Sequence, residues 1–156
     1  MQRRHPSGDA THDELDLAVN ALVSIVDELR RLAHGMRPRL LDDGLEVALN
    51  SLVANSPIPV QVQVDEMDAS EAVVTTAYFV VAEALANALK HAHASRVNVR
   101  VGPINGRLGV EVLDDGIGGA RTGFGVTALR DRVAALDGEL DIRSELGAGT
   151  RIRAIL

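Results

Sequence analysis

This chain of 156 residues is poor in several residue types, and each scarcity excludes a class of protein. It has no cysteine, which excludes disulfide bridges and thiolate metal sites. Aromatic residues make up 2% and tryptophan is absent, so stacking platforms for single-stranded nucleic acid are not expected. The net charge of -6 also lacks the basic footprint of a nucleic-acid-binding protein. We therefore expect no nucleic-acid partner.

Long apolar runs are scarce as well. We find no run that approaches the length of a membrane span and no signal-like apolar segment after Met1. We therefore expect a cytoplasmic protein without direct membrane insertion. Hydrophobic residues make up 46% and charged residues 24%, which is ordinary for a soluble fold with a real core, and a length of 156 residues fits one domain plus an appended element.

The first 37 residues predict a segment separate from the rest. Residues 1–10 are polar and contain Pro6 and Gly8, which predicts a disordered lead. Apolar residues then recur at alternating steps of four and three: Leu15, Val19, Leu22, Val26, Leu29, Ala33 and Met36. Pro38 ends this helix, because proline disfavours the helical conformation in the preceding residue. We expect a bundle helix over residues 11–37 whose mate lies in a second copy or another polypeptide; packing on its own domain is the alternative.

Residues 38–156 predict a single α+β domain. Helical patterns cover residues 45–54, a long segment through residues 78–93 that begins near Asp68 or Ser70, and residues 126–138. Alternating patterns predict strands at residues 60–64, 96–101, 108–113, 139–144 and 150–156, with a hairpin turn at Asn105-Gly106. Strands joined mostly by hairpins, with helices on one face, indicate a two-layer α/β sandwich rather than a Rossmann sheet.

The long helix has an unusual polar face. Glu83, Asn87 and Lys90 recur at steps of four and three, so they lie on one side, with His91 at its border. A carboxylate, a carboxamide and a cation together can hold a metal-bound phosphate. Mg²⁺ prefers oxygen ligands, and an ammonium group can meet phosphate oxygens. Taken alone, this helix leaves an ordinary solvated face as an equal alternative.

Three glycine motifs follow the long helix. A predicted strand ends in Asp114-x-Gly116-x-Gly118, where the carboxylate can accept a hydrogen bond from an exocyclic amine and the glycines admit a flat ring. Gly123-Phe-Gly125 opens the next helix, whose free N–H groups suit phosphates. Gly147-Ala-Gly149-Thr150 enters the last strand. Each motif alone is also typical of an ordinary turn.

Together, in this order and spacing, the motifs closely resemble the ATP-binding domain of sensor histidine kinases. That domain belongs to a family that shares a Bergerat-type ATP fold with gyrase, Hsp90 and MutL. In its terms, residues 83–91 form the N-box, residues 114–118 the G1 box and residues 123–125 the G2 box. The resemblance covers roughly residues 29–156. Residues 30–49 are further similar to the junction between dimerisation and ATP-binding domains in the subfamily that partners LuxR-type response regulators.

The resemblance implies that the N-box meets the metal and the phosphates. Asn87 would ligate Mg²⁺, while Lys90 and His91 would contact the phosphates of ATP. Glu83 occupies the place where related ATPases activate water. Because a kinase should avoid hydrolysis, the resemblance leaves the catalytic role of Glu83 open.

The glycine motifs would hold the rest of the nucleotide. Asp114 would accept a hydrogen bond from the adenine amino group, and Thr150 would support the Asp114 end of the site. The glycines that border the nucleotide would be Gly116 and Gly118 at the base, and Gly123 and Gly125 at the triphosphate. Two departures from the family pattern are a very short lid, residues 120–122, and Val126-Thr127-Ala128-Leu129 in place of L-x-G-M. Thr127 can still donate hydrogen bonds there.

The chain lacks the family's phosphoacceptor histidine. His12-Asp13 matches the expected dipeptide, but it lies so close to Pro38 that only one helix fits between them. We therefore expect a histidine protein kinase fragment, truncated or naturally split, that does not autophosphorylate alone. Its acceptor would lie on dimerisation helices of the same full-length kinase, which can itself be membrane-anchored, or of a separate chain. Whether this chain forms a homodimer stays open.

Two alternatives accompany this reading. An anti-sigma-factor serine kinase has the same ATP fold, but the heptad helix and the Arg37-Pro38 junction argue against it. An interaction module that has lost nucleotide binding is disfavoured, because all three box motifs are intact.

Overall fold

The structure is a computed structural model that describes residues 38–119 and 124–156. The predicted lead, the predicted bundle helix with His12, the lid residues 120–122 and Gly123 lie outside the described residues. The side chain of Phe124 is also outside this description.

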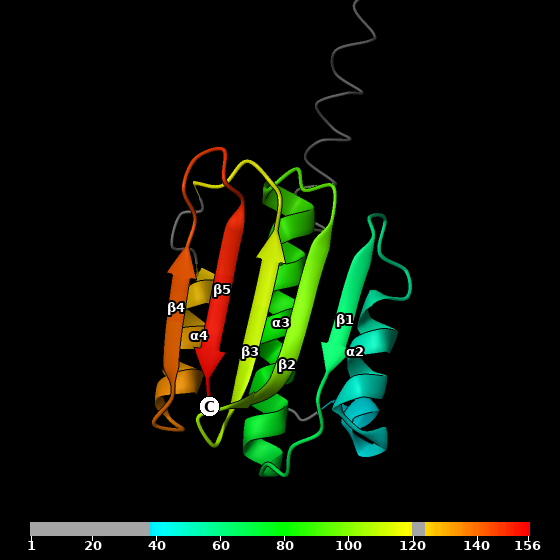
Figure 1. The fold of residues 1–156 in the computed structure, drawn as a ribbon, viewed down its shortest axis with the longest axis vertical. Coiled ribbons are helices and arrows are strands. Elements are labelled where there is room, and N and C mark those ends of the chain that lie inside the picture. The colour runs from blue at the N-terminus through cyan, green and yellow to red at the C-terminus, as the bar shows by residue number, and fades with distance from the viewer. Residues whose placement is uncertain (1–37, 120–123) are drawn as a thin grey trace, which may run out of the picture. The chain divides into compact units, whose positions relative to one another are not determined.

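A five-stranded mixed sheet organises the described residues (Figure 1). Its strands are β1 (Val60–Val64), β2 (Val97–Ile104), β3 (Arg107–Asp114), β4 (Glu139–Arg143) and β5 (Thr150–Ile155). Their order across the sheet is β1-β2-β3-β5-β4, with β1 parallel to β2 and every other pair antiparallel. Asn105 and Gly106 join β2 to β3 with φ values of 52° and 80°, as the predicted two-residue hairpin requires.

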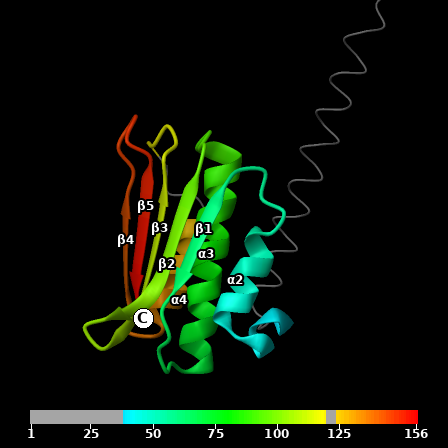
Figure 2. The ribbon, with the colours of Figure 1, turned by 45° about the vertical axis from the view of Figure 1, so that its right-hand side comes forward.

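The helices form a second layer on one face of this sheet. They are α2 (Leu45–Val53), α3 (Glu71–His91) and α4 (Phe124–Ala134), and a short 3-10 helix, η1 (Arg39–Asp43), precedes α2. Figure 1 shows α3 running behind the middle strands, with α2 on the β1 side and α4 on the β4 side, and Figure 2 shows the helices together on one side of the sheet. The opposite face of the sheet carries no described helix. The predicted two-layer α+β sandwich is therefore confirmed.

Alternation along the strands builds the core between the two layers. On β3, Val110 and Val112 are 0% and 3% exposed and face the helices, while Glu111 between them is only half-buried. On α3, Val81, Leu85 and Ala88 are all buried and belong to the same hydrophobic core as these two valines. The same alternation places Asp114, the last residue of β3, on the helix-covered face of the sheet.

The apolarity of α3 bears on the expectation that no apolar run approaches the length of a membrane span. By length and composition alone α3 is apolar enough to cross a membrane, with a mean hydropathy of 1.6 over its best window. Its apolar side chains instead pack on the sheet as the central core helix, with Val80 and Ala77 fully buried. This position accounts for the composition of the helix.

Several element boundaries, and one short element, differ from the sequence-based expectation. Strand β2 extends to Ile104 because it pairs with β3 along its whole length. Helix α4 ends at Ala134, before Gly138, because the Gly138 N–H bonds to the Val133 carbonyl at 2.9 Å and closes the helix. η1 was not predicted. Of the two residues near which α3 was expected to begin, Ser70 is the N-cap, since its Oγ accepts from the Val73 N–H at 3.4 Å.

Candidate functional site

The polar face of α3 meets the start of α4. Glu83 and Asn87 are half-buried, and the Asn87 Nδ2 donates to Glu83 Oε1 at 3.4 Å. A Cβ atom added at Gly125 would lie 1.8 Å from the same Glu83 oxygen. The absence of a side chain at Gly125 therefore lets the Glu83 carboxylate reach the first turn of α4. Lys90 and His91 lie exposed in the last turn of α3.

Asp114 is held by two backbone donors at the end of β3. Its Oδ1 accepts from the Gly116 N–H at 2.9 Å and from the Thr150 N–H at 3.2 Å. Within the described residues, its second oxygen, Oδ2, makes no hydrogen bond. The carboxylate is thus fixed through one oxygen and keeps the other as an acceptor.

The G1 box packs tightly on the end of α3. A Cβ atom added at Gly116 would lie 2.3 Å from the Ala92 carbonyl oxygen, and the Ile117 N–H donates to that same oxygen at 2.8 Å. Only glycine fits at position 116, because a contact below 3.0 Å with backbone is not tolerated.

The turn between β4 and β5 packs on the other side of the G1 box. Gly118 approaches the Glu145 carbonyl so closely that an added Cβ would lie 1.8 Å from it. The Gly147 N–H donates to the Ile117 carbonyl at 2.7 Å. Gly149, with φ of 74°, leaves no room for a Cβ beside the Asp114 carbonyl, at 2.0 Å. The third glycine motif is therefore a support for the G1 box rather than a simple hairpin turn.

Thr150 supports Asp114 through its backbone, and its side chain is held separately. Its Oγ1 lies 2.8 Å from the Ser144 Oγ, which ties the two ends of the β4–β5 turn together. The sequence motif indicates the position of Thr150, but the partner Ser144 follows only from the strand pairing.

Sequence reasoning missed Asp115, which binds the start of β2. Its Oδ1 accepts from the Ser95 N–H at 2.8 Å and the Arg96 N–H at 3.0 Å, and its Oδ2 accepts from the Ser95 Oγ at 2.6 Å. These hydrogen bonds, together with the nearby Arg96 guanidinium, lower the pKa of Asp115 to about 2. The available signal was the Asp-Asp-Gly sequence, since aspartate often accepts from turn N–H groups.

The described residues bring the sequence-predicted site residues into two groups of contacts. Glu83, Asn87 and Gly125 meet between α3 and α4, whereas Asp114, Gly116, Gly118 and Thr150 meet where β3 ends beside β5. Gly123 and the lid lie outside the described residues, so their place in the site stays a prediction. Within residues 38–119 and 124–156, no group of three or more His, Cys, Asp or Glu side chains gathers as a metal site.

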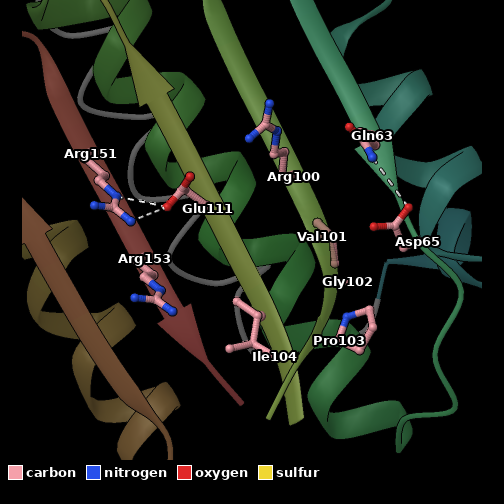
Figure 3. A pocket seen from close by; sticks show the side chains of 11 residues that line it. Gln63, Asp65, Arg100, Val101, Gly102, Pro103, Ile104, Glu111, Arg151 and Arg153 are labelled. Carbon is pink, nitrogen blue, oxygen red and sulfur yellow. Dashed lines mark hydrogen bonds and ion pairs between the residues drawn. The ribbon is translucent and has the colours of Figure 1, made fainter. Parts of the chain in front are cut away.

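A separate cavity lies on the open face of the sheet (Figure 3). Its volume is about 260 Å³, and it is lined by β1, β2, β3 and β5 residues that include Arg100, Glu111 and Arg153. Arg151 donates from Nε to Glu111 Oε2 at 2.9 Å across one edge of it. None of the sequence-predicted site residues lines this cavity, because they belong to the helix-covered side.

Known proteins share both the sequence and the fold of this chain. Residues 72–156 match the family described as histidine kinase-, DNA gyrase B-, and HSP90-like ATPase. The sensor histidine kinase MctS of Rhizobium johnstonii is 35% identical over 91% of this chain and 34% of its own length. The histidine-protein kinase/phosphatase UhpB of Salmonella typhimurium is 35% identical over 86% of this chain and 29% of its own length.

A solved structure agrees with these sequence matches. The histidine kinase domain of the blue-light activated kinase EL346 from Erythrobacter litoralis is 28% identical, with a TM-score of 0.59. The match covers 71% of this chain and 57% of that domain. This chain spans about a third of the length of the curated relatives named above. It belongs to the histidine kinase-, DNA gyrase B- and HSP90-like ATPase family, as the ATP-binding catalytic domain of a sensor histidine kinase.

Proposed function

We propose that this chain binds Mg²⁺-ATP at the junction of α3, β3 and α4 and transfers the γ-phosphoryl group to a histidine on another segment. The observation that carries the proposal is the Asp114 carboxylate. One oxygen is held by the Gly116 and Thr150 N–H groups, and the other is left to accept from an adenine amino group. Gly116 and Gly118 keep side chains away from the base.

The phosphate end would be built by α3 and α4. Because Asn87 donates through Nδ2 to Glu83, its carbonyl oxygen Oδ1 remains for Mg²⁺, which prefers oxygen donors. Lys90 and His91, in the last turn of α3, would contact phosphate oxygens. Gly123 and Gly125 would border the triphosphate at the start of α4, where backbone N–H groups and the helix dipole favour negative charge. Bound Mg²⁺ would offset charge on the transferring phosphoryl group.

Glu83 has two candidate roles at this site. Its carboxylate is the one carboxylate in the N-box, and it also accepts from Asn87 beside Gly125. We favour orientation of Asn87 as its main role, because a base that activates water would promote hydrolysis in place of transfer to histidine. A Glu83→Gln variant separates the roles, since glutamine keeps an acceptor for Asn87 but cannot accept a proton.

The phosphoryl acceptor and the downstream partner lie outside this chain. We propose that the acceptor is a histidine on dimerisation helices, in the same full-length kinase or in a separate polypeptide. A LuxR-type response regulator would then receive the phosphoryl group. The relatives named above are described as sensor and signal-transduction histidine kinases, which supports this assignment. We also propose that the domain is cytoplasmic.

Calorimetry with ADP and Mg²⁺ tests the nucleotide site. Wild type should bind ADP, and Asp114→Asn should weaken binding at least about tenfold, as loss of a hydrogen bond to a charged group predicts. Transfer of label from ATP to a separate histidine-bearing helix pair tests the kinase activity. Equal ADP binding by wild type and Asp114→Asn would rule out this site, and labelling of this chain alone would contradict the absence of an acceptor.

A further inference from the structure

The connection between α3 and β2 is joined to the G1 box by one side chain. Asp115 accepts from the Ser95 N–H, the Ser95 hydroxyl and the Arg96 N–H at 2.8, 2.6 and 3.0 Å. Its Oδ2 also lies 3.4 Å from the Arg96 Nε. The donor residues, Ser95 and Arg96, directly precede β2, whereas Asp115 immediately follows β3.

Asp115 and its neighbour Asp114 anchor the same short backbone from opposite sides. Asp114 is held by the Thr150 N–H of β5, and Asp115 holds the donors at the start of β2. Next along the chain, the Gly116 Cα packs against Ala92, and the Ile117 N–H donates to the Ala92 carbonyl at 2.8 Å. The G1 backbone is therefore clamped between β5 and the end of α3.

The clamp connects the two ends of the proposed nucleotide site. Lys90 and His91 occupy the last turn of α3, and Ala92 to Arg96 follow directly to the donors that Asp115 binds. The distance from the phosphate-contacting residues to Asp114 therefore depends on how firmly this connection is held. A shift of about 1 Å in such a constellation can cost as much as two orders of magnitude in its function.

We propose that Asp115 is a positioning residue for nucleotide binding, which holds the α3–β2 connection against the G1 box and so aligns Asp114 with the N-box. This inference rests on the proposed nucleotide site. Asp115 itself touches no nucleotide in this assignment, and it acts through the backbone of residues 114–116 and 92–96.

The backbone hydrogen bonds, not the ion pair, should carry this effect. The Arg96 side chain is 70% exposed, and exposed ion pairs contribute little because water and salt screen them. Arg96→Ala removes the guanidinium and keeps the Arg96 N–H, so it is the matched control. Asp115→Asn keeps a carbonyl oxygen for the two N–H donors, so it should rescue most of what Asp115→Ala loses.

The experiment measures the Kd of ADP with Mg²⁺ by calorimetry, and the Tm, for wild type and the variants. Asp115→Ala should raise the Kd about tenfold, the loss expected for charge-assisted hydrogen bonds that align a site. Asp115→Asn should stay within about threefold of wild type, and Arg96→Ala should bind as wild type does. All titrations are made well below each variant's Tm, so that only folded protein is compared.

Each outcome then decides for or against the inference. A lowered Tm with an unchanged Kd in Asp115→Ala would overturn it, because a merely structural contact behaves in that way. If Asp115→Ala does not fold, Asp115→Ser is measured by the same two readouts, since its short hydroxyl cannot reach both N–H donors. Asp114→Ala distinguishes failure of the proposed nucleotide site from failure of this inference. If Asp114→Ala binds ADP with wild-type affinity, the proposed site is wrong. If Asp114→Ala loses affinity but Asp115→Ala binds normally, only the positioning role of Asp115 is wrong.

Discussion

Asp114 and Thr150 lie opposite each other in the β3–β5 ladder, and the Thr150 N–H donates to Asp114 Oδ1 at 3.2 Å. Strand pairing thus positions the carboxylate that, in our proposal, accepts a hydrogen bond from the adenine amino group. Gly149, the residue before Thr150, is buried with a positive φ of 74° against the Asp114 carbonyl. This close contact is possible because Gly149 has no side chain.

Gly149→Ala should therefore impair both stability and nucleotide binding. The added Cβ would overlap the Asp114 carbonyl at 2.0 Å and also force alanine into a left-handed conformation. We expect a loss of about 3 kcal/mol in the free energy of unfolding, from conformational strain plus overpacking. Chemical denaturation measures this loss, and ADP calorimetry measures the weakened binding.

Gly147→Ala is the matched control for that prediction. Gly147 has a similar φ of 78°, but nothing lies within 4 Å of an added Cβ. It should lose only the conformational part, about 1 kcal/mol, and bind ADP normally. Equal losses in the two variants would show that the contact with Asp114 does not matter.

Gly125→Ala should weaken Mg²⁺-nucleotide binding with little effect on stability. The added Cβ would displace the Glu83 carboxylate, which is the end of a flexible side chain and can move at low cost. Moving the Glu83 carboxylate breaks the hydrogen bond that it accepts from Asn87 Nδ2, so the Asn87 amide loses its orientation. We expect the Kd of Mg²⁺-ADP to rise by about threefold to tenfold, the range for one hydrogen bond.

A double-mutant cycle checks the cause of this effect. In a Glu83→Ala background, the Cβ at position 125 meets no carboxylate, so Gly125→Ala should have little further effect on the Kd. Additive effects of the two substitutions would mean that Gly125 acts independently of Glu83.

The pH dependence of stability should carry a contribution from Asp115. Its pKa is lowered from 3.8 to about 2 by the Ser95 hydroxyl, the Arg96 and Ser95 N–H groups and the Arg96 guanidinium. A depressed carboxyl pKa stabilises the fold above the unfolded value, and this contribution is lost as pH falls through the folded value. The Tm difference between wild type and Asp115→Asn should therefore be constant above about pH 5 and should shrink between about pH 4 and pH 2. A difference that does not change with pH would show that the charge on Asp115 contributes nothing.

Local patterns predict most elements of this fold, because they depend on neighbours along the chain. The alternation Val-Gln-Val-Gln-Val gives β1 its bounds, and the steps between Glu83, Asn87 and Lys90 place them on one side of α3. Ser70 begins α3 as a typical N-cap. The order of strands is different: β5 lies between β3 and β4, and no local pattern encodes that arrangement.

The same limit applies to the site. The carboxylate of Asp114 is visible in the motif, but the donors that fix it come from Gly116 nearby and Thr150 on another strand. The contact between Glu83 and Gly125 and the hydrogen bonds of Asp115 to Ser95 join segments that only the fold brings together. Periodicity and motif spacing cannot predict such contacts, since each partner alone is an ordinary helix or turn residue.

Asn87→Ala should reduce the dependence of ADP binding on Mg²⁺. The proposed metal ligand is Oδ1, which is left available because Nδ2 donates to Glu83, and alanine removes it without changing the buried face of α3. Calorimetry gives the Kd of ADP with and without Mg²⁺. The ratio of the Kd without Mg²⁺ to the Kd with Mg²⁺ should be large for wild type and near one for the variant. Asn98→Ala, a half-buried asparagine on β2, is the control and should keep the wild-type ratio. If Asn87→Ala keeps that ratio while binding ADP more weakly, Asn87 contacts the nucleotide and not the metal.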